Sequence, residues 1–300
     1  MSRASKRSGG DRRKEAAPVG RTAKQLLRAV GGGLLVGLPL LFTMEMWFHS
    51  FLLPSWNIVV LLLVAFVVVI GYSAVSGFRR ERSWRELLVD SVETMGIAAI
   101  VAAVALVILG RIGPDVGLRD AIGKIGLQMI PVSFGVALAG TELAGGGDAD
   151  EADRGSPGAE RAASAPVGRL FVAAGAALLF ALNIAVTEEP MLLGVEAEWW
   201  LLVAVVVASL AMTLAIVFYA DFRGGRSPGA SDSPLDHPIS ETLAAYAISL
   251  GLSLFLLWSF GRTAGASVSA IVGQTVVLAF VASFGAAAGR LLVGGGEEAA

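Results

Sequence analysis

The sequence predicts an all-α membrane protein with about eight transmembrane helices. Of its 300 residues, 55% are hydrophobic and only 16% are charged, and the mean hydropathy is +0.71. A soluble domain typically has about 45–50% apolar and about 25% charged residues. So much apolar surface requires lipid around it, and the bilayer is therefore the first partner that the sequence predicts.

Several apolar segments are each long enough to cross a bilayer as a helix of about 17–25 residues. Their approximate ranges are 29–53, 57–77, 91–110, 122–143, 168–187, 199–220, 240–260 and 268–293. The polar, basic residues 1–28 predict a disordered tail, and the Gly, Ala, Asp and Glu of residues 145–167 predict a disordered acidic linker. The sequence thus predicts two four-helix units, 29–144 and 168–293, followed by a short tail over 294–300.

The distribution of basic residues predicts the orientation, because Lys and Arg are retained in cytoplasmic loops. With the amino terminus in the cytoplasm, 19 of the 23 Lys and Arg residues fall on that side. The opposite side receives only Arg111, Arg119, Lys124 and Arg262. Since an even number of spans returns the chain to its starting side, we expect a multi-pass protein of the cell membrane with both termini cytoplasmic.

The two predicted units resemble each other. At shifts of 144 to 151 residues, six residues of the first unit match six of the second. The pairs are Thr43 with Thr187, Glu45 with Glu189, Glu93 with Glu241, Thr94 with Thr242, Arg111 with Arg262, and Gly135 with Gly285. Their common order and nearly constant spacing predict an internal duplication. Because each unit has an even number of spans, both repeats enter from the same side and are parallel, as in some transporters.

Two acidic residues of the predicted spans are the leading candidates for a functional site. Glu45 lies in the outer third of the first span, and Glu189 lies near the end of the fifth. A charged side chain at midspan costs roughly 3 kcal/mol on insertion scales, so it usually faces a bundle interior, a partner or water. We expect two carboxylates with raised pKa that bind a proton or a small cation. The alternative is that both reach the headgroup region and hydrogen-bond a nearby threonine or tryptophan.

A second acidic pair begins the third and seventh spans. Glu93 and Glu241 lie near helix starts, where helix capping and the helix dipole favour a carboxylate. A structural role is therefore the leading interpretation. The alternative is that they form the inner end of an ion path. Pro39 and its counterpart Asn183 are helix-break candidates. Such a break either frees a carbonyl for a cation or only kinks the helix for packing.

Polar and small residues within the spans predict helix contacts. Gln128 and Gln274 lie inside spans four and eight, where they either line a path or, more commonly, tie helices together. Gly135 and Gly285 belong to small-residue pairs that permit close helix approach.

Several functional classes are not expected. The chain has no cysteine and only two histidines, His49 and His237, so the sequence predicts no disulfide, no metal site and no cofactor. It contains no P-loop, no Gly-x-Ser-x-Gly elbow and no His-Glu-x-x-His, so an enzyme is not predicted. No nucleic-acid partner is expected, and homo-oligomerisation is left open.

Two short motifs and the overall length carry a resemblance to a known family. With Thr43-Met44-Glu45-Met46-Trp47 and Val92-Glu93-Thr94-Met95, the chain resembles a prokaryotic family of integral membrane proteins of unknown function, eight-span and duplicated, over about residues 25 to 293. The resemblance implies a membrane protein and no particular activity. The leading hypothesis is a secondary transporter or channel for protons or a small cation. The chief alternative is a non-transporting scaffold or sensor subunit, and a lipid-modifying enzyme is the least favoured.

Overall fold

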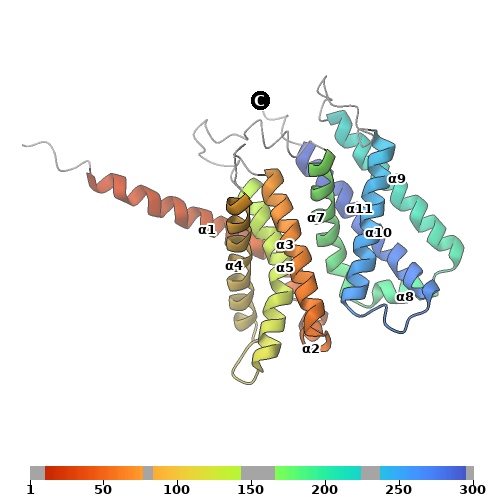
Figure 1. The fold of residues 1–300 in the computed structure, drawn as a ribbon, viewed down its shortest axis with the longest axis horizontal. Helices are drawn as coiled ribbons and strands as arrows, with labels where there is room; N and C mark the ends of the chain where they lie inside the picture. The colour runs from red at the N-terminus through yellow and green to blue at the C-terminus, as the bar shows by residue number, and fades with distance from the viewer. Residues whose placement is uncertain (1–10, 77–83, 143–165, 224–236, 295–300) are drawn as a thin grey trace, which may run out of the picture.

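The computed structural model describes residues 11–76, 84–142, 166–223 and 237–294, and all the regular structure in these ranges is helical (Figure 1). In chain order, the helices are α1 (Asp11–Leu41), α2 (Met44–Leu52), α3 (Ser55–Ser76), α4 (Trp84–Ile108), α5 (Leu118–Glu142), α7 (Pro166–Ala185), α8 (Glu189–Glu196), α9 (Trp199–Arg223), α10 (Pro238–Ser259) and α11 (Val268–Gly294). The predicted all-α fold is confirmed.

Among the described residues, seven helices are long and apolar enough to cross a membrane by themselves: α3, α4, α5, α7, α9, α10 and α11. An eighth crossing requires α1 and α2 together, and these two helices are bent by 79° at the break between them. Seven to eight spans agree with the predicted number. The first span was expected over 29–53 with Pro39 as a helix-break candidate, and the observed break follows Leu41, two residues after Pro39.

The element boundaries differ from the prediction at two places. Helix α1 already begins at Asp11, so residues 11–28 are helical where a disordered tail was expected; their Ala, Leu, Lys, Arg and Glu are strong helix formers despite their polarity. The short helix α8 occupies Glu189–Glu196, where only a loop was expected, and Pro190 in its first turn favours helix initiation there. Residues 1–10, 145–165 and 295–300 of the predicted tails and linker lie outside the described residues.

The two halves of the chain have the same element order. A long helix, a short helix and three further long helices follow one another in 11–142 and again in 166–294. Helices α2 and α8 lie at the same end of the molecule, the lower end in Figure 1, together with the connections 109–117 and 260–267. We call this the α2/α8 end.

Equivalent hydrogen bonds occur at the shifts found in the sequence. After α4, the Arg111 amide donates to the Leu106 carbonyl over 2.8 Å, and after α10, the Arg262 amide donates to the Leu257 carbonyl over 2.8 Å. Both turns contain a glycine with positive φ, 65° at Gly110 and 73° at Gly261, as the C-terminal cap of a helix requires. An internal duplication remains an interpretation of the chain, and such equivalent turns are what it predicts.

Close glycine contacts join the first and last long helices of each half. A Cβ at Gly135 of α5 would collide with the Gly32 carbonyl of α1, and one at Gly285 of α11 would collide with the Ala176 carbonyl of α7. The close helix approach predicted for Gly135 and Gly285 is therefore confirmed.

The two halves also share a core. Helix α3 of the first half packs on α7 of the second, where Gly71 accommodates the Phe171 ring and Val68 contacts Gly175. At the α2/α8 end of this boundary, the buried Asn57 side chain donates to the Ser259 carbonyl of α10 over 2.8 Å.

Candidate functional site

The structure does not bring the two leading acidic candidates together. Glu45 is half-buried in the first turn of α2, and Glu189 is exposed in the first turn of α8. Each follows the break after the first long helix of its own half. Among the described contacts, no hydrogen bond joins the two carboxylates. A shared interior site made of Glu45 and Glu189 therefore has no contact to support it.

The protonation behaviour of Glu189 differs from the prediction. A hydrogen bond with the Thr187 hydroxyl and the free amides at the start of α8 hold the pKa of Glu189 below its ordinary value, and Arg262 adds a smaller electrostatic contribution. The raised pKa expected for this residue is wrong, because its carboxylate is exposed rather than desolvated.

The carbonyls at the first helix break already have partners. The Thr43 hydroxyl donates to the Pro39 carbonyl over 2.7 Å, the Gln128 amide to the Leu40 carbonyl over 2.8 Å, and the Trp47 indole to the Leu41 carbonyl over 2.9 Å. Gln128 thus ties α5 to α1, the commoner of its two expected roles. These three consecutive carbonyls are hydrogen-bonded, so the break after Leu41 has the contacts of a structural turn, as the packing alternative for Pro39 predicts.

The second break is capped by an arginine. The Arg262 guanidinium donates to the Val186 and Thr187 carbonyls over 3.1 and 3.2 Å, which is favourable at the end of a helix because the carbonyls there carry partial negative charge. Asn183 donates to the Leu179 carbonyl over 2.8 Å within α7. A cation at the Val186 and Thr187 carbonyls would therefore have to compete with a fixed positive charge.

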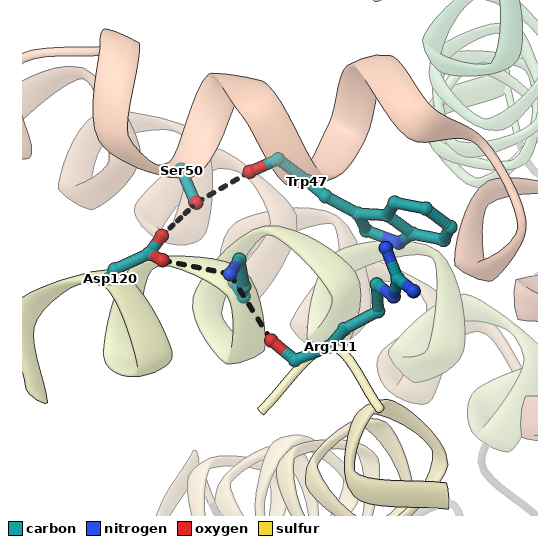
Figure 2. A network of polar contacts seen from close by, with 5 residues as sticks. Trp47, Ser50, Arg111 and Asp120 are labelled. Atoms are coloured by element: carbon teal, nitrogen blue, oxygen red, sulfur yellow. Dashed lines mark hydrogen bonds and ion pairs between the residues drawn. The ribbon is translucent and has the colours of Figure 1, made fainter. Parts of the chain in front are cut away.

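A polar network that was not predicted from the sequence fixes α2 to α5 (Figure 2). The Ser50 hydroxyl lies 2.6 Å from Asp120 Oδ1 and 2.6 Å from the Trp47 carbonyl, and Lys124 Nζ lies 2.8 Å from Asp120 Oδ2. Lys124 also donates to the Arg111 carbonyl over 3.1 Å, and the Arg111 guanidinium covers the Trp47 ring at 4.7 Å. The i,i+4 spacing of Asp120 and Lys124 was the available sequence signal.

This network exists in the first half alone. At the repeat shifts of 144 and 150, Ser50 corresponds to Gly194, Asp120 to Ala270 and Lys124 to Gln274. In the second half, Gly194 and Gly273 bring the backbones of α8 and α11 into direct contact. In the first half, a Cβ at Gly123, the counterpart of Gly273, would likewise collide with the Ser50 carbonyl, so the network is added to a close contact that both halves have and has the character of a structural lock.

The second acidic pair has two different environments. Glu93 is exposed on α4, whereas Glu241 is buried on α10, with 8% of its surface exposed. Arg169 of α7 places its Nε 4.0 Å from Glu241 Oε1, and both side chains are largely enclosed. A buried acid at the end of a span needs a compensating partner, and Arg169 supplies the positive charge.

Glu241 begins a line of buried polar side chains along α10, which we call the α10 polar stripe. Its members follow one another at helical spacing and lie on one face: Glu241, Thr242, Tyr246, Ser249 and Ser253. On the two helices α9 and α11, which pack against α10, Ser209 and Thr213 of α9 and Gln274 of α11 are also buried. The three-to-four spacing of the α10 residues could have revealed the stripe in the sequence.

The corresponding positions of the first half are largely apolar. At a shift of 148, Tyr246, Ser249 and Ser253 correspond to Ala98, Val101 and Ala105 of α4. At a shift of 144, Ser209 and Thr213 correspond to Ala65 and Val69 of α3. The polar character thus belongs to the second half and is not a by-product of the common architecture.

The fold and these buried polar groups define a polytopic α-helical membrane protein. Residues 25–293 match the family described as "Putative integral membrane protein (DUF2391)", and the chain belongs to this family. No curated protein and no solved structure matches it.

Proposed function

We propose that the protein moves protons or a small cation across the membrane through its second half, and that Glu241 is the principal protonatable or ion-binding group. The observation that carries the proposal is the α10 polar stripe, which begins at this buried carboxyl group. In the predicted orientation, the α2/α8 end faces the outside and Glu241 lies near the cytoplasmic end of α10.

The cost of buried polarity in a membrane supports this proposal. Acidic side chains within transmembrane segments are rare, usually face a protein interior or a hydrated cavity, and often mark ion or proton pathways. Glu241 has this setting, whereas Glu189 is exposed and Glu45 lies beside a capped helix break. We therefore assign the leading role to Glu241 and keep Glu45 and Glu189 as candidates for an outer entrance.

A non-transporting scaffold or sensor is the alternative function. The observation that favours it is the full capping of both helix breaks, by Thr43, Gln128 and Trp47 in the first half and by Arg262 in the second. Such capping fits acids that serve the architecture of the α2/α8 end.

Flux measurements separate the two functions. The purified full chain is reconstituted in liposomes, and proton, sodium and potassium flux are measured under an imposed gradient. We expect flux that falls at least about tenfold in Glu241→Gln, because a proton-transferring group commonly contributes that much or more. The matched variant Glu93→Gln, at the exposed counterpart, should retain wild-type flux.

Two further variants test the outer acids. Loss of flux in Glu45→Gln or Glu189→Gln would place these carboxylates in the pathway, and unchanged flux in both would remove them from it. Absence of flux for all three ions in wild-type liposomes would overturn the transport proposal in favour of the scaffold or sensor. Equal flux in wild type and Glu241→Gln would remove Glu241 from the mechanism.

A further inference from the structure

We propose that water fills a polar seam inside the second half and that this seam conducts protons rather than metal cations. The seam consists of the α10 polar stripe together with Ser209 and Thr213 of α9 and Gln274 of α11. The inference rests on the proposed transport function and names both its path and its substrate.

Unpartnered hydroxyls are the first evidence for water in the seam. The side-chain oxygens of Thr213, Thr242 and Ser253 and the Gln274 Oε1 are buried and have no hydrogen-bond partner among the residues that the structure describes. These residues are between 0% and 4% exposed. A buried polar atom in hydrocarbon surroundings costs free energy unless it is hydrogen-bonded, and bound water is the usual partner when the protein offers none.

The usual solution for a hydroxyl in a transmembrane helix is visible nearby. Ser249 donates to the Ala245 carbonyl over 2.8 Å, and Ser209 donates to the Val205 carbonyl over 2.7 Å, each within its own helix. Thr213, Thr242 and Ser253 do not make this bond. Their hydroxyls are therefore available to neighbouring water.

The seam extends through much of the membrane thickness. From Glu241 to Ser253 there are twelve residues, which a helix spans in about 18 Å of a hydrocarbon core about 30 Å thick. Ser253 lies six residues before the end of α10, and Gln274 lies six residues after the start of α11. Because the two helices are antiparallel neighbours joined at the α2/α8 end, these two residues lie at a similar depth, nearer that end than Glu241.

The chemistry of the seam favours protons. Water and hydroxyl groups each accept one proton on one side and release another on the opposite side, so a chain of them passes protons without a lasting charge on any member. The Glu241 carboxyl group lies at one end of this chain, between the seam and the aqueous side, where a proton can pass from one to the other. A metal cation instead needs several oxygen ligands at once. In the described part of the chain, no three His, Asp or Glu side chains gather for that purpose.

The test combines flux with a direct readout of internal water. Thr213→Val and Thr242→Val remove two hydroxyls while keeping the side-chain shape, and Thr94→Val is the matched control at the counterpart of Thr242. Proton and sodium flux of the full chain in liposomes are measured for each variant. Radiolytic hydroxyl labelling with mass spectrometry, which marks side chains beside bound water, is applied to Tyr246 of the seam and to the buried Phe134 of the first half.

For the wild type, we expect proton flux without sodium flux, and labelling of Tyr246 but not of Phe134. The Thr213→Val, Thr242→Val double variant should lose both the proton flux and the Tyr246 labelling. The control Thr94→Val should retain both. Proton flux that persists in the double variant while Tyr246 stays unlabelled overturns the seam and leaves the transport function intact. Labelling of Tyr246 in a chain that shows no flux overturns the transport function and leaves the hydrated seam. Sodium flux that the double variant abolishes overturns the choice of protons.

Discussion

Gly135 of α5 lies directly against the backbone carbonyl of Gly32 in α1, with no room for a side chain between them. The counterpart contact joins Gly285 of α11 to the Ala176 carbonyl of α7. In lipid, helix association depends on such close packing, because the hydrocarbon around the helices is as apolar as their side chains. These two contacts therefore fix the position of the first long helix in each half.

Adding one methyl group at either contact should destabilise the protein. We expect Gly135→Ala and Gly285→Ala to lower the free energy of unfolding by about 1–3 kcal/mol, because overpacking forces backbones apart. Gly96→Ala is the control, since this exposed glycine in α4 has open space around its Cα. It should be neutral or raise stability by up to about 1 kcal/mol through helix propensity. Unfolding in mixed micelles measures all three, and equal stability of Gly135→Ala and Gly96→Ala would contradict the contact.

Two helix caps at the α2/α8 end depend on glycine. Gly110 and Gly261 have φ of 65° and 73°, a conformation that costs other residues roughly 1–2 kcal/mol. We expect Gly110→Ala and Gly261→Ala each to lower stability by about this amount, and the corresponding asparagine variants to lower it less, because asparagine tolerates the left-handed region better. Gly113→Ala, in the same connection but without positive φ, should cost little. A large effect at Gly113 together with none at Gly110 would show that the cap is not formed.

Much of the fold could be predicted from the sequence because hydropathy decides it. The long apolar segments identify the membrane spans, and the glycine pairs identify close contacts without any tertiary information. Pro39 made a helix break near this point a candidate, but the 79° angle of the bend after Leu41 could not be predicted, because hydropathy does not distinguish a straight apolar helix from a bent one. Capping of the broken end by Gln128, 88 residues away, decides the geometry there.

The site was harder to predict for a related reason. Glu45, Glu189, Glu93 and Glu241 look alike in sequence, yet Glu189 and Glu93 are exposed, Glu45 is half-buried and Glu241 is enclosed beside Arg169. Burial depends on which neighbouring helix covers the side chain, and that is a tertiary property. The helical spacing of the α10 serines and threonines was a signal in the sequence, but it could not show which hydroxyls lack a bond within their own helix, because most such residues in membrane helices bond to their own backbone.

The ionisation of Glu189 should depend on Thr187. We expect Thr187→Val to raise the pKa of Glu189 toward the ordinary glutamate value, because the hydroxyl is the largest cause of its lowering. Thr43→Val, the counterpart in the first half, is the control and should leave this pKa unchanged. Isotope-edited infrared titration of the carboxyl group measures it, and an unchanged value in Thr187→Val would contradict the assigned cause.

The lowered pKa of Glu189 also fixes the sign of its contribution to stability. A carboxylate whose pKa is lower in the folded state than in the unfolded state stabilises the folded protein. This stabilisation is fully present at a pH above the pKa of the unfolded state, about 4.3, and is lost as the pH falls through the lower pKa of the folded state. The difference in stability between wild type and Glu189→Gln should therefore be constant near neutral pH and shrink in acid below about pH 4. A difference that instead grows on acidification would contradict a lowered pKa.

The orientation that the basic residues predict can be tested with single cysteines, because the sequence contains none. Asp115 lies exposed in the connection at the α2/α8 end, and His237 lies exposed just before α10 at the opposite end. On intact cells, a membrane-impermeant maleimide should label Asp115→Cys, whereas His237→Cys should react only after the membrane is opened. The 19 to 4 distribution of Lys and Arg predicts this pattern, because basic loops resist translocation. The reverse pattern would place Glu241 at the outer face, so protons would enter the proposed seam at Glu241 from outside the cell.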